Sequence, residues 1–216
     1  MELDSQLKIK QEKQTKRTLV FIAVIIGTFM SAIEGTIVST AMPSIVSDLG
    51  GFKLYSWVFS IYLLMQAVTI PIYGKLADLF GRKPVYTVGV IIFLIGSVLC
   101  GFANSMSELI FYRFLQGLGA GAVQPIATTI VGDIYTLKER AKVQGYLASV
   151  WGISSIVGPT LGGIFVDYFH WSLVFWINIP FGIVSIILMM LFLHEGIEKK
   201  KHSIDYLGSS LLFLSI

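Results

Sequence analysis

Charged residues are scarce in this 216-residue chain. They make up 13% of it, whereas hydrophobic residues make up 55%, and the mean hydropathy is +0.77. A soluble globular domain needs a polar surface, and about a quarter of its residues are usually charged. The composition therefore excludes an ordinary soluble domain and predicts an integral membrane protein.

Cysteine and histidine are also rare, with one and three residues respectively. The single Cys100 excludes a disulfide within the chain, and inside an apolar run it indicates a small packed side chain. The histidines lie in or beside expected loops, and the sequence has no His-Glu-x-x-His motif and no paired-cysteine spacing. We therefore expect no metal site and no cofactor.

Six apolar runs are long enough to cross the roughly 30 Å hydrocarbon core of a bilayer, which takes about 20 helical residues. A seventh begins at Tyr206 and reaches Ile216, about half a crossing. The leader is hydrophilic and the first run is too long for a signal peptide, so we expect that run to remain as an anchor. The six runs are Leu19–Met42, Ser56–Leu76, Val85–Ala103, Leu109–Val131, Val143–Val166 and Leu173–Leu193.

These runs predict an all-α integral membrane fold with one domain. We expect a cytoplasmic N-terminal segment over residues 1–18, a six-helix transmembrane bundle over 19–193, a cytoplasmic loop over 194–205 and the start of a truncated seventh helix over 206–216. Six helices with both ends on one side also fit two three-helix repeats of opposite topology, a plan that many secondary transporters share.

Lysine and arginine are distributed unevenly between the two sides of this bundle. Five precede the first run, and three lie in or beside each turn after the second, fourth and sixth runs, whereas the opposite turns carry Lys53 alone. Because these residues gather on the cytoplasmic side of membrane proteins, we predict a cytoplasmic N-terminus. This topology accounts for the net charge of +3, so no nucleic-acid partner is indicated.

Two charged residues lie within the apolar runs. Glu34 is roughly 22 Å above the cytoplasmic face in the first run, and Arg113 is roughly 6 to 9 Å below the outer face in the fourth. A charge near the bilayer centre costs at least ~2.5 kcal/mol, so it is usually retained for function. Opposite charges at similar depth are expected to pair or to face one aqueous cavity. A static ion pair that only joins two helices is the alternative.

A glutamate whose surroundings alternate between dry and wet, or between Arg-paired and unpaired, can load and release a proton near neutral pH. Glu34 is therefore the predicted proton or cation site, and Arg113 its electrostatic modulator. Aromatic side chains in the runs are candidates for stacking on a cationic substrate, although interfacial anchoring is the preferred explanation for several of them. These aromatic residues are Trp57, Tyr62, Phe111 and Trp151.

The turn between the second and third runs reads GKLADLFGRKP, from Gly74 to Pro84. Gly81 permits a left-handed bend, and Pro84 suits the first turn of a helix. The pattern resembles the signature of the major facilitator superfamily between its second and third helices, where the resemblance implies a cytoplasmic gate. The matching residues are Gly74, Leu76, Ala77, Asp78, Gly81, Arg82 and Lys83.

Two later stretches are similar to the drug:proton antiporters of that family. RFLQGLGAG matches an arginine-centred motif that the resemblance ties to proton transfer. GISSIVGPTLGG matches the antiporter motif; its glycines favour close helix packing and its proline can kink the helix, which makes it a candidate hinge. The matching residues are Arg113, Gln116, Gly117, Gly119 and Ala120 in the first stretch, and Gly152, Gly158, Pro159, Gly162 and Gly163 in the second.

Three further stretches resemble narrower branches of the family. Glu34-Gly35-Thr36 is similar to the first-helix motif of the multidrug branch, which usually has aspartate where this chain has glutamate. WSLVFWINIPFG, residues 171–182, and IDYLG, residues 204–208, resemble the fourteen-helix drug-export branch. The resemblance covers essentially the whole chain and implies the N-terminal half of such a transporter.

The resulting hypothesis is a secondary active transporter and not an enzyme. It would export amphipathic, often cationic drugs across the plasma membrane as protons enter, driven by the proton motive force. Its partners would be small amphipathic substrates, protons, the lipid bilayer and a second half that this chain lacks. Two alternatives stay open: a proton-coupled transporter of one specific metabolite, and a truncated half-unit that binds a ligand or partner without transport.

Overall fold

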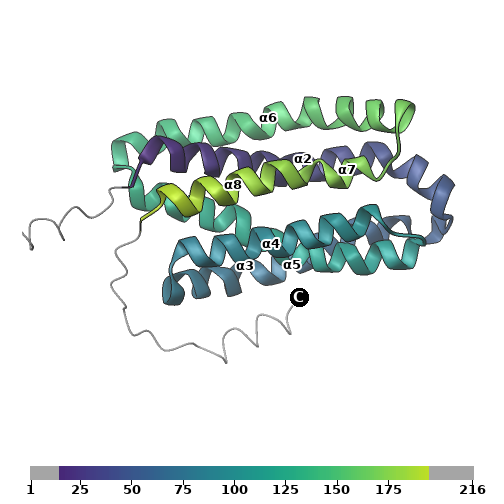
Figure 1. The fold of residues 1–216 in the computed structure, drawn as a ribbon, viewed down its shortest axis with the longest axis horizontal. Coiled ribbons are helices and arrows are strands. Elements are labelled where there is room, and N and C mark those ends of the chain that lie inside the picture. Colours follow the sequence, from purple (N-terminus) through teal and green to yellow (C-terminus); the bar gives the residue numbers. More distant parts are fainter. Residues whose placement is uncertain (1–14, 195–216) are drawn as a thin grey trace, which may run out of the picture.

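The computed structural model describes residues 15–194, which form helices and no strand (Figure 1). Residues 1–14 and 195–216 lie outside the described residues, and with them most of the expected N-terminal segment, nearly all of the loop expected over 194–205 and the seventh helix expected over 206–216. The elements are α2 (Arg17–Leu49), the 3-10 helix η1 (Phe52–Leu54), α3 (Tyr55–Phe80), α4 (Arg82–Gly101), α5 (Met106–Ile134), α6 (Leu137–Tyr168), α7 (Leu173–Trp176) and α8 (Asn178–Phe192).

Six segments are long and apolar enough to cross a membrane, as the six apolar runs predicted. Most of them extend beyond those runs, and α2, for example, continues to Leu49. The last span is divided into α7 and α8 beside Ile177. Pro180 explains the division, because it has no backbone N–H to bond the carbonyl group of Trp176 four residues earlier.

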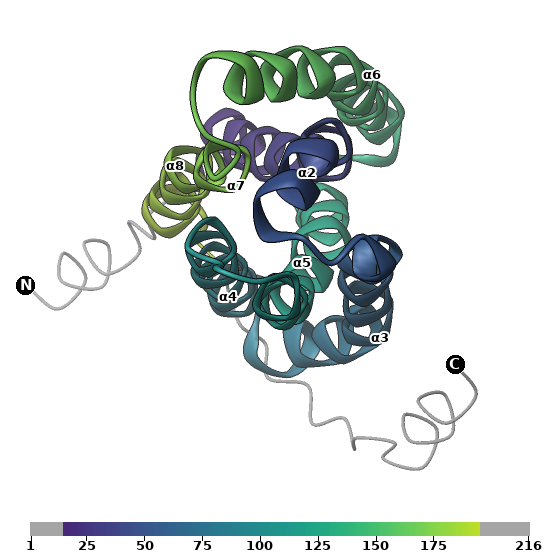
Figure 2. The same ribbon diagram turned by 90° about the vertical axis from the view of Figure 1, so that its right-hand side faces the viewer.

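The spans pack as two three-helix groups (Figures 1 and 2). α3 and α4 pack on α5, α6 and α8 pack on α2, and the groups meet where α2 contacts α5 and α4 contacts α8. The two halves of the chain contribute equivalent helices: α2 corresponds to α5, α3 to α6, and α4 to the α7–α8 pair. When each helix is replaced by its counterpart, the same set of helix contacts results. Because α5, the fourth span, runs opposite to α2, the pairing is that expected of two inverted three-helix repeats.

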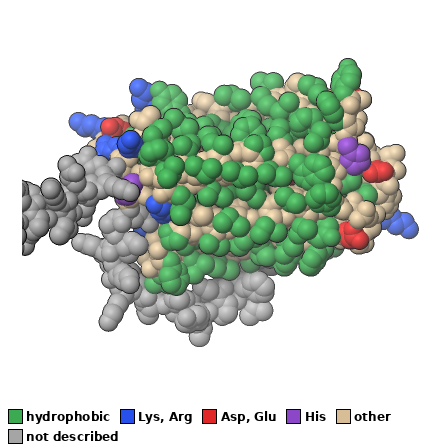
Figure 3. Space-filling model, in the orientation of Figure 1, with side chains coloured by type: hydrophobic (Ala, Val, Ile, Leu, Met, Phe, Trp, Pro, Cys, Tyr) green, Lys and Arg blue, Asp and Glu red, His purple; other side chains and the backbone are tan. Residues whose placement is uncertain are grey.

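Charged side chains gather at the two ends of the bundle, and apolar side chains cover the face between them (Figure 3). We call the end that holds Arg17, Arg82, Lys83 and Arg140 the basic end. An apolar belt between polar ends is what contact with lipid requires. Exposed large apolar side chains on the six spans include Leu63, Ile91, Ile156 and Leu191.

Caps at the opposite end determine where α5 begins. Ser105 Oγ accepts a hydrogen bond from the backbone N–H of Glu108 at 3.2 Å, and the Glu108 carboxylate accepts one from the backbone N–H of Asn104 at 2.9 Å. Such caps satisfy N–H groups that have no partner inside the helix. They set the start of α5 about two turns before Arg113.

Candidate functional site

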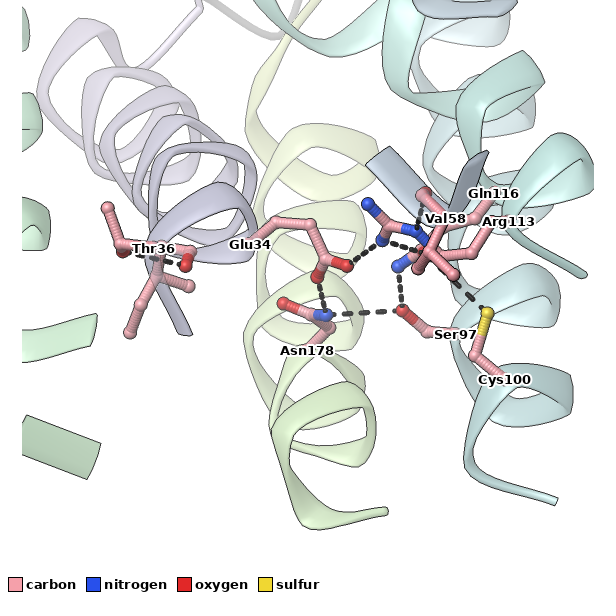
Figure 4. Close-up of polar contacts among 9 residues, drawn as sticks. Glu34, Thr36, Val58, Ser97, Cys100, Arg113, Gln116 and Asn178 are labelled. Atoms are coloured by element: carbon pink, nitrogen blue, oxygen red, sulfur yellow. Dashed lines mark hydrogen bonds and ion pairs between the residues drawn. The ribbon is translucent and has the colours of Figure 1, made fainter. Parts of the chain in front are cut away.

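The two charges that the sequence places in the membrane meet inside the bundle. Glu34 of α2 is fully buried, and Arg113 of α5 is 1% exposed. Arg113 Nη1 donates a hydrogen bond to Glu34 Oε1 in a direct ion pair (Figure 4). The two charges therefore form a direct pair, which is one of the two arrangements that the sequence predicted. Because both charged groups are buried away from water, each must be stabilised by the other and by nearby polar groups.

The second carboxylate oxygen of Glu34 is held from α8. Asn178 Nδ2 donates to Glu34 Oε2 at 2.6 Å and also lies 3.2 Å from Ser97 Oγ on α4. Asn178 and Ser97 are both fully buried. The two carboxylate oxygens therefore receive hydrogen bonds from two different helices, one from α5 and one from α8 (Figure 4).

Gln116 extends this network along α5 and across to α4. Its Oε1 accepts from Arg113 Nη1 at 2.7 Å, and the thiol of Cys100 is a weak donor to the same oxygen at 3.7 Å. Its Nε2 donates to Ser97 Oγ at 2.7 Å. Ser97 thus accepts from two amides, and the network joins α2, α4, α5 and α8.

The Arg113 guanidinium is enclosed by α3. Its Nε donates to the carbonyl oxygen of Val58 at 3.2 Å, and its central carbon lies 4.1 Å from the centroid of the Tyr62 ring. The sequence made Tyr62 a candidate for stacking on a cationic substrate, but in the structure its ring faces a cation of the protein itself. This contact helps to stabilise a buried charge.

Glycines on α5 allow α3 and α4 to approach the site. A Cβ atom at Gly117 would lie 2.6 Å from the carbonyl oxygen of Tyr62, and one at Gly119 would lie 2.5 Å from the carbonyl oxygen of Gly89. The GLGAG stretch, residues 117–121, is therefore where α5 packs closely against both α3 and α4, since only glycine permits so close an approach.

The Gly74–Pro84 segment, which the sequence predicted as a turn, lies at the basic end. In the structure it consists of the last residues of α3, the single connecting residue Gly81 and the first residues of α4. Gly81 has φ +96°, the left-handed conformation that the sequence predicted for it. Pro84 is in the first turn of α4, where its missing N–H is not needed. A Cβ atom at Gly74 would meet nothing within 4 Å, so packing inside this chain does not require a glycine there.

The charged residues of this turn contact α5 and the end of α8. Arg82 Nε lies 3.1 Å from the Asp133 carboxylate on α5, and its Nη2 lies 3.5 Å from the Asp78 carboxylate on α3. Lys83 Nζ donates to the carbonyl oxygen of Leu193 at 2.8 Å. These contacts therefore join the start of α4 to the ends of α3, α5 and α8.

The predicted hinge segment of α6 packs on α2 through two of its glycines. A Cβ atom at Gly158 would lie 2.9 Å from the Cβ of Thr36, and one at Gly162 would lie 3.0 Å from the carbonyl oxygen of Ile37. Thr36 Oγ1 also donates to the backbone carbonyl of Ser154 at 3.2 Å. This close seam lies two to three residues along α2 from Glu34.

The other members of that motif do not pack in the seam. A Cβ atom at Gly152 or Gly163 would meet nothing within 4 Å. Pro159 is exposed, and α6 is one continuous helix through it. A hinge role for this segment stays a prediction.

Sequence reasoning missed Asn178 and Ser97. Both are polar residues inside apolar runs, and a buried amide is unfavourable unless it is hydrogen-bonded, which was the available signal. Their partner was not predictable, because the contact between Asn178 and Glu34 joins residues 144 positions apart.

The network offers one carboxylate, already occupied on both oxygens by donors from Arg113 and Asn178. Within residues 15–194, no three or more histidine, cysteine or acidic side chains are grouped as a metal site requires. The change that this arrangement can undergo is the gain of a proton by Glu34, which would weaken its attraction to Arg113.

Comparison with known proteins gives a consistent family. The sequence profile of the Major Facilitator Superfamily matches residues 24–211. Multidrug transporter protein MdtP of Bacillus subtilis (strain 168) is 47% identical over 194 residues, which cover 90% of this chain and 35% of that protein. Multidrug resistance protein 3 of the same organism is 43% identical over 204 residues, which cover 94% of this chain and 40% of that protein. The chain thus spans two fifths or less of the length of these relatives.

A solved structure has the same fold. The human organic anion transporter MFSD10 (TETRAN) matches with a TM-score of 0.75, covering 92% of this chain and 54% of that one. The two sequences are 18% identical, so the likeness concerns the arrangement of the helices.

Proposed function

Because this chain belongs to the major facilitator superfamily, we propose that it forms the N-terminal half of a proton-coupled exporter of amphipathic, often cationic compounds. Two relatives are named as a multidrug transporter and a multidrug resistance protein, which supports this substrate class. We further propose that it lies in the plasma membrane with the basic end in the cytoplasm, since lysine and arginine gather on that side.

The observation that carries the proposal is the buried Glu34 carboxylate. It has no exposed surface, and Arg113 and Asn178 donate to its two oxygens. While ionised, the carboxylate holds α2 against α5 and α8. After it takes up a proton it attracts the guanidinium less, so the contact between these helices weakens. Proton binding is thereby coupled to helix packing, and a ligand that prefers one packing state shifts the equilibrium between the two.

A cationic substrate fits this site because a carboxylate released from Arg113 attracts either a proton or another cation. Binding of a proton then favours release of the cationic substrate, and binding of the substrate favours release of the proton. Such competition can exchange the two in opposite directions across the membrane. Proton entry contributes about 2.3 kcal/mol for each 100 mV of membrane potential. This is the driving force that we assign to export.

Two further features support a cycle of opening and closing. At the basic end, Arg82 pairs with Asp133 and Asp78, and we propose that these contacts, together with Lys83, form the cytoplasmic gate. Along α6, Gly158 and Gly162 let the helix backbone lie close against α2, and we propose that this segment serves as the hinge.

The test is substrate-induced proton release after reconstitution into liposomes, both with this chain and with any longer protein that contains it. Ethidium, a lipophilic cationic dye, serves as the probe. We expect Glu34→Gln to abolish the release, because the amide cannot take up a proton. Glu108→Gln, at the exposed start of α5, is the matched control and should release protons normally. If Glu34→Gln releases protons as the unmodified protein does, Glu34 is not the exchange site and the proposal fails.

A further inference from the structure

Asn178 has one buried polar atom without a partner. Its Nδ2 donates to Glu34 and Ser97, whereas its Oδ1 is buried and accepts no hydrogen bond. Buried carbonyl oxygens are rarely left in this state, because the lost contact with water is not replaced. The orphan oxygen belongs to the same amide that holds the proposed proton site.

The Glu34 carboxyl changes its hydrogen-bonding character when it takes up a proton. An ionised carboxylate only accepts, whereas a protonated carboxyl group carries an O–H that must donate. Arg113 has no acceptor to offer. The Gln116 oxygen already accepts from Arg113 and Cys100. Of the described side chains bonded to Glu34, Asn178 is the one that carries a vacant acceptor oxygen.

We propose that the Asn178 side-chain amide turns by half a rotation when Glu34 takes up a proton, so that Oδ1 accepts the carboxyl O–H. The inference rests on the proposed function, since it assumes proton exchange at Glu34. The proton stays on the carboxyl group in this step, and the amide only replaces its N–H donor with its carbonyl acceptor. Asn178 is thus a positioning residue that gives Glu34 a partner in both of its forms.

Ser97 allows this rotation to occur without loss of its own contact. Its Oγ now accepts from Asn178 Nδ2 and Gln116 Nε2. A hydroxyl group both donates and accepts, and its hydrogen rotates freely, so Ser97 can donate to Asn178 Oδ1 after the turn. Both contacts of the amide then persist with their direction reversed, and the terminal torsion of asparagine is soft enough to allow it.

No other titratable group around Glu34 changes its charge in the acid range and could thereby cause the Asn178 amide to turn. The titratable or charged neighbours are Arg113 from α5, Tyr62 from α3 and Cys100 from α4. α7 and α8 carry no charged residue, and apart from Glu34 the charged residues of α2 and α6 lie near the helix ends. Arg113 keeps its charge, and a phenol or thiol ordinarily titrates far above the acid range in which a carboxylate takes up a proton.

Infrared difference spectroscopy tests the rotation directly. The chain has two asparagines, Asn104 and Asn178, so asparagine labelled with carbon-13 in its side chain reports on Asn178 alone in an Asn104→Ser variant. Spectra of the 216-residue chain at neutral and acidic pH are compared. We expect a carboxylic acid band that Glu34→Gln lacks, together with a shift of the labelled amide carbonyl band to lower frequency as its oxygen becomes an acceptor.

The other outcomes separate this inference from the proposed function. A Glu34 acid band without a shift of the labelled amide overturns the rotation and leaves Glu34 as the proton site. An amide shift that persists in Glu34→Gln assigns the change to another group and also overturns the rotation. The absence of any Glu34 acid band overturns proton exchange at Glu34 and the rotation with it.

A pair of substitutions gives an independent test through proton release. Asn178→Leu is close in size but neither donates nor accepts, and we expect it to slow substrate-induced proton release roughly tenfold or more. Asn178→Gln keeps the amide donor and acceptor on a longer side chain, and its rate of proton release should be closer to that of the unmodified protein. Asn104→Leu, at an exposed residue, is the control. An Asn178→Leu variant with the rate and pH profile of the unmodified protein contradicts the inference.

Discussion

Gly96 of α4 lies directly against the backbone of Gln116 in α5, so that a Cβ atom at Gly96 would come within 2.5 Å of the Gln116 nitrogen. Gln116 in turn bonds Arg113 and Ser97. The close approach of the two helices and the polar network around Glu34 therefore depend on the same glycine.

We expect Gly96→Ala to destabilise the bundle by about 1–3 kcal/mol, because one methyl group forces α4 away from α5. Thermal unfolding of the purified chain in detergent measures this. Gly145→Ala in α6 is the matched control: its Cβ would meet nothing within 4 Å, and alanine is the better helix former. Equal unfolding temperatures for the two variants would show that the α4–α5 contact tolerates a side chain.

The Glu34–Arg113 pair should behave as a coupled unit. Arg113→Met leaves a buried carboxylate without its cation, which we expect to cost about 3–5 kcal/mol of unfolding free energy. In the double variant Glu34→Gln/Arg113→Met that charge is gone, so the double variant should be more stable than Arg113→Met alone. The unfolding free energies of Glu34→Gln, Arg113→Met and the double variant complete a double-mutant cycle. If the double variant is less stable than Arg113→Met, the cost of Arg113→Met does not come mainly from the unpaired Glu34 charge.

A second polar contact joins α2, α4 and α8 nearer the basic end. The Tyr86 hydroxyl lies 2.8 Å from Ser185 Oγ, which donates to the carbonyl oxygen of Ala23 at 2.8 Å. Gly27 leaves the space that this hydroxyl occupies, since a Cβ atom there would overlap the Tyr86 oxygen.

This overlap predicts a suppressor. Gly27→Ala should destabilise the chain, and Tyr86→Phe should restore part of the loss because it removes the overlapping oxygen. Tyr86→Phe by itself should cost roughly 1 kcal/mol, the value of one hydrogen bond. The unfolding temperature of Gly27→Ala/Tyr86→Phe is the decisive measurement. If it falls below that of Gly27→Ala, the hydroxyl is not the source of the conflict.

The Arg82–Asp133 contact should matter more for transport than for stability. The two side chains are 29% and 52% exposed, and ion pairs in water contribute about 1 kcal/mol at most. The unfolding free energy of Asp133→Asn should therefore lie within about 1 kcal/mol of that of the unmodified chain. If the turn is the gate, the same variant should slow ethidium-driven proton release severalfold, whereas Asp167→Asn, an exposed residue of α6, should not. Unchanged release in Asp133→Asn argues against the gate.

Predictions from the sequence succeeded where the determining interactions are local. The left-handed Gly81 and the start of α4 near Pro84 follow from the conformations that these two residues allow. The pairing of Glu34 with Arg113 was accessible because helix rise converts sequence position into depth. The role of Tyr62 was not accessible, because depth alone does not tell whether a ring faces substrate or a cation of the protein.

The amino-acid sequence by itself determined that six helices cross a membrane and that two opposite charges lie at one depth among them, because the length of an apolar run and the rise of a helix are local properties. Only the tertiary structure decided that Asn178 and Ser97 complete the site. Their contacts depend on how each helix is turned about its own axis, and that turn is set where neighbouring backbones meet at glycines such as Gly96 and Gly119.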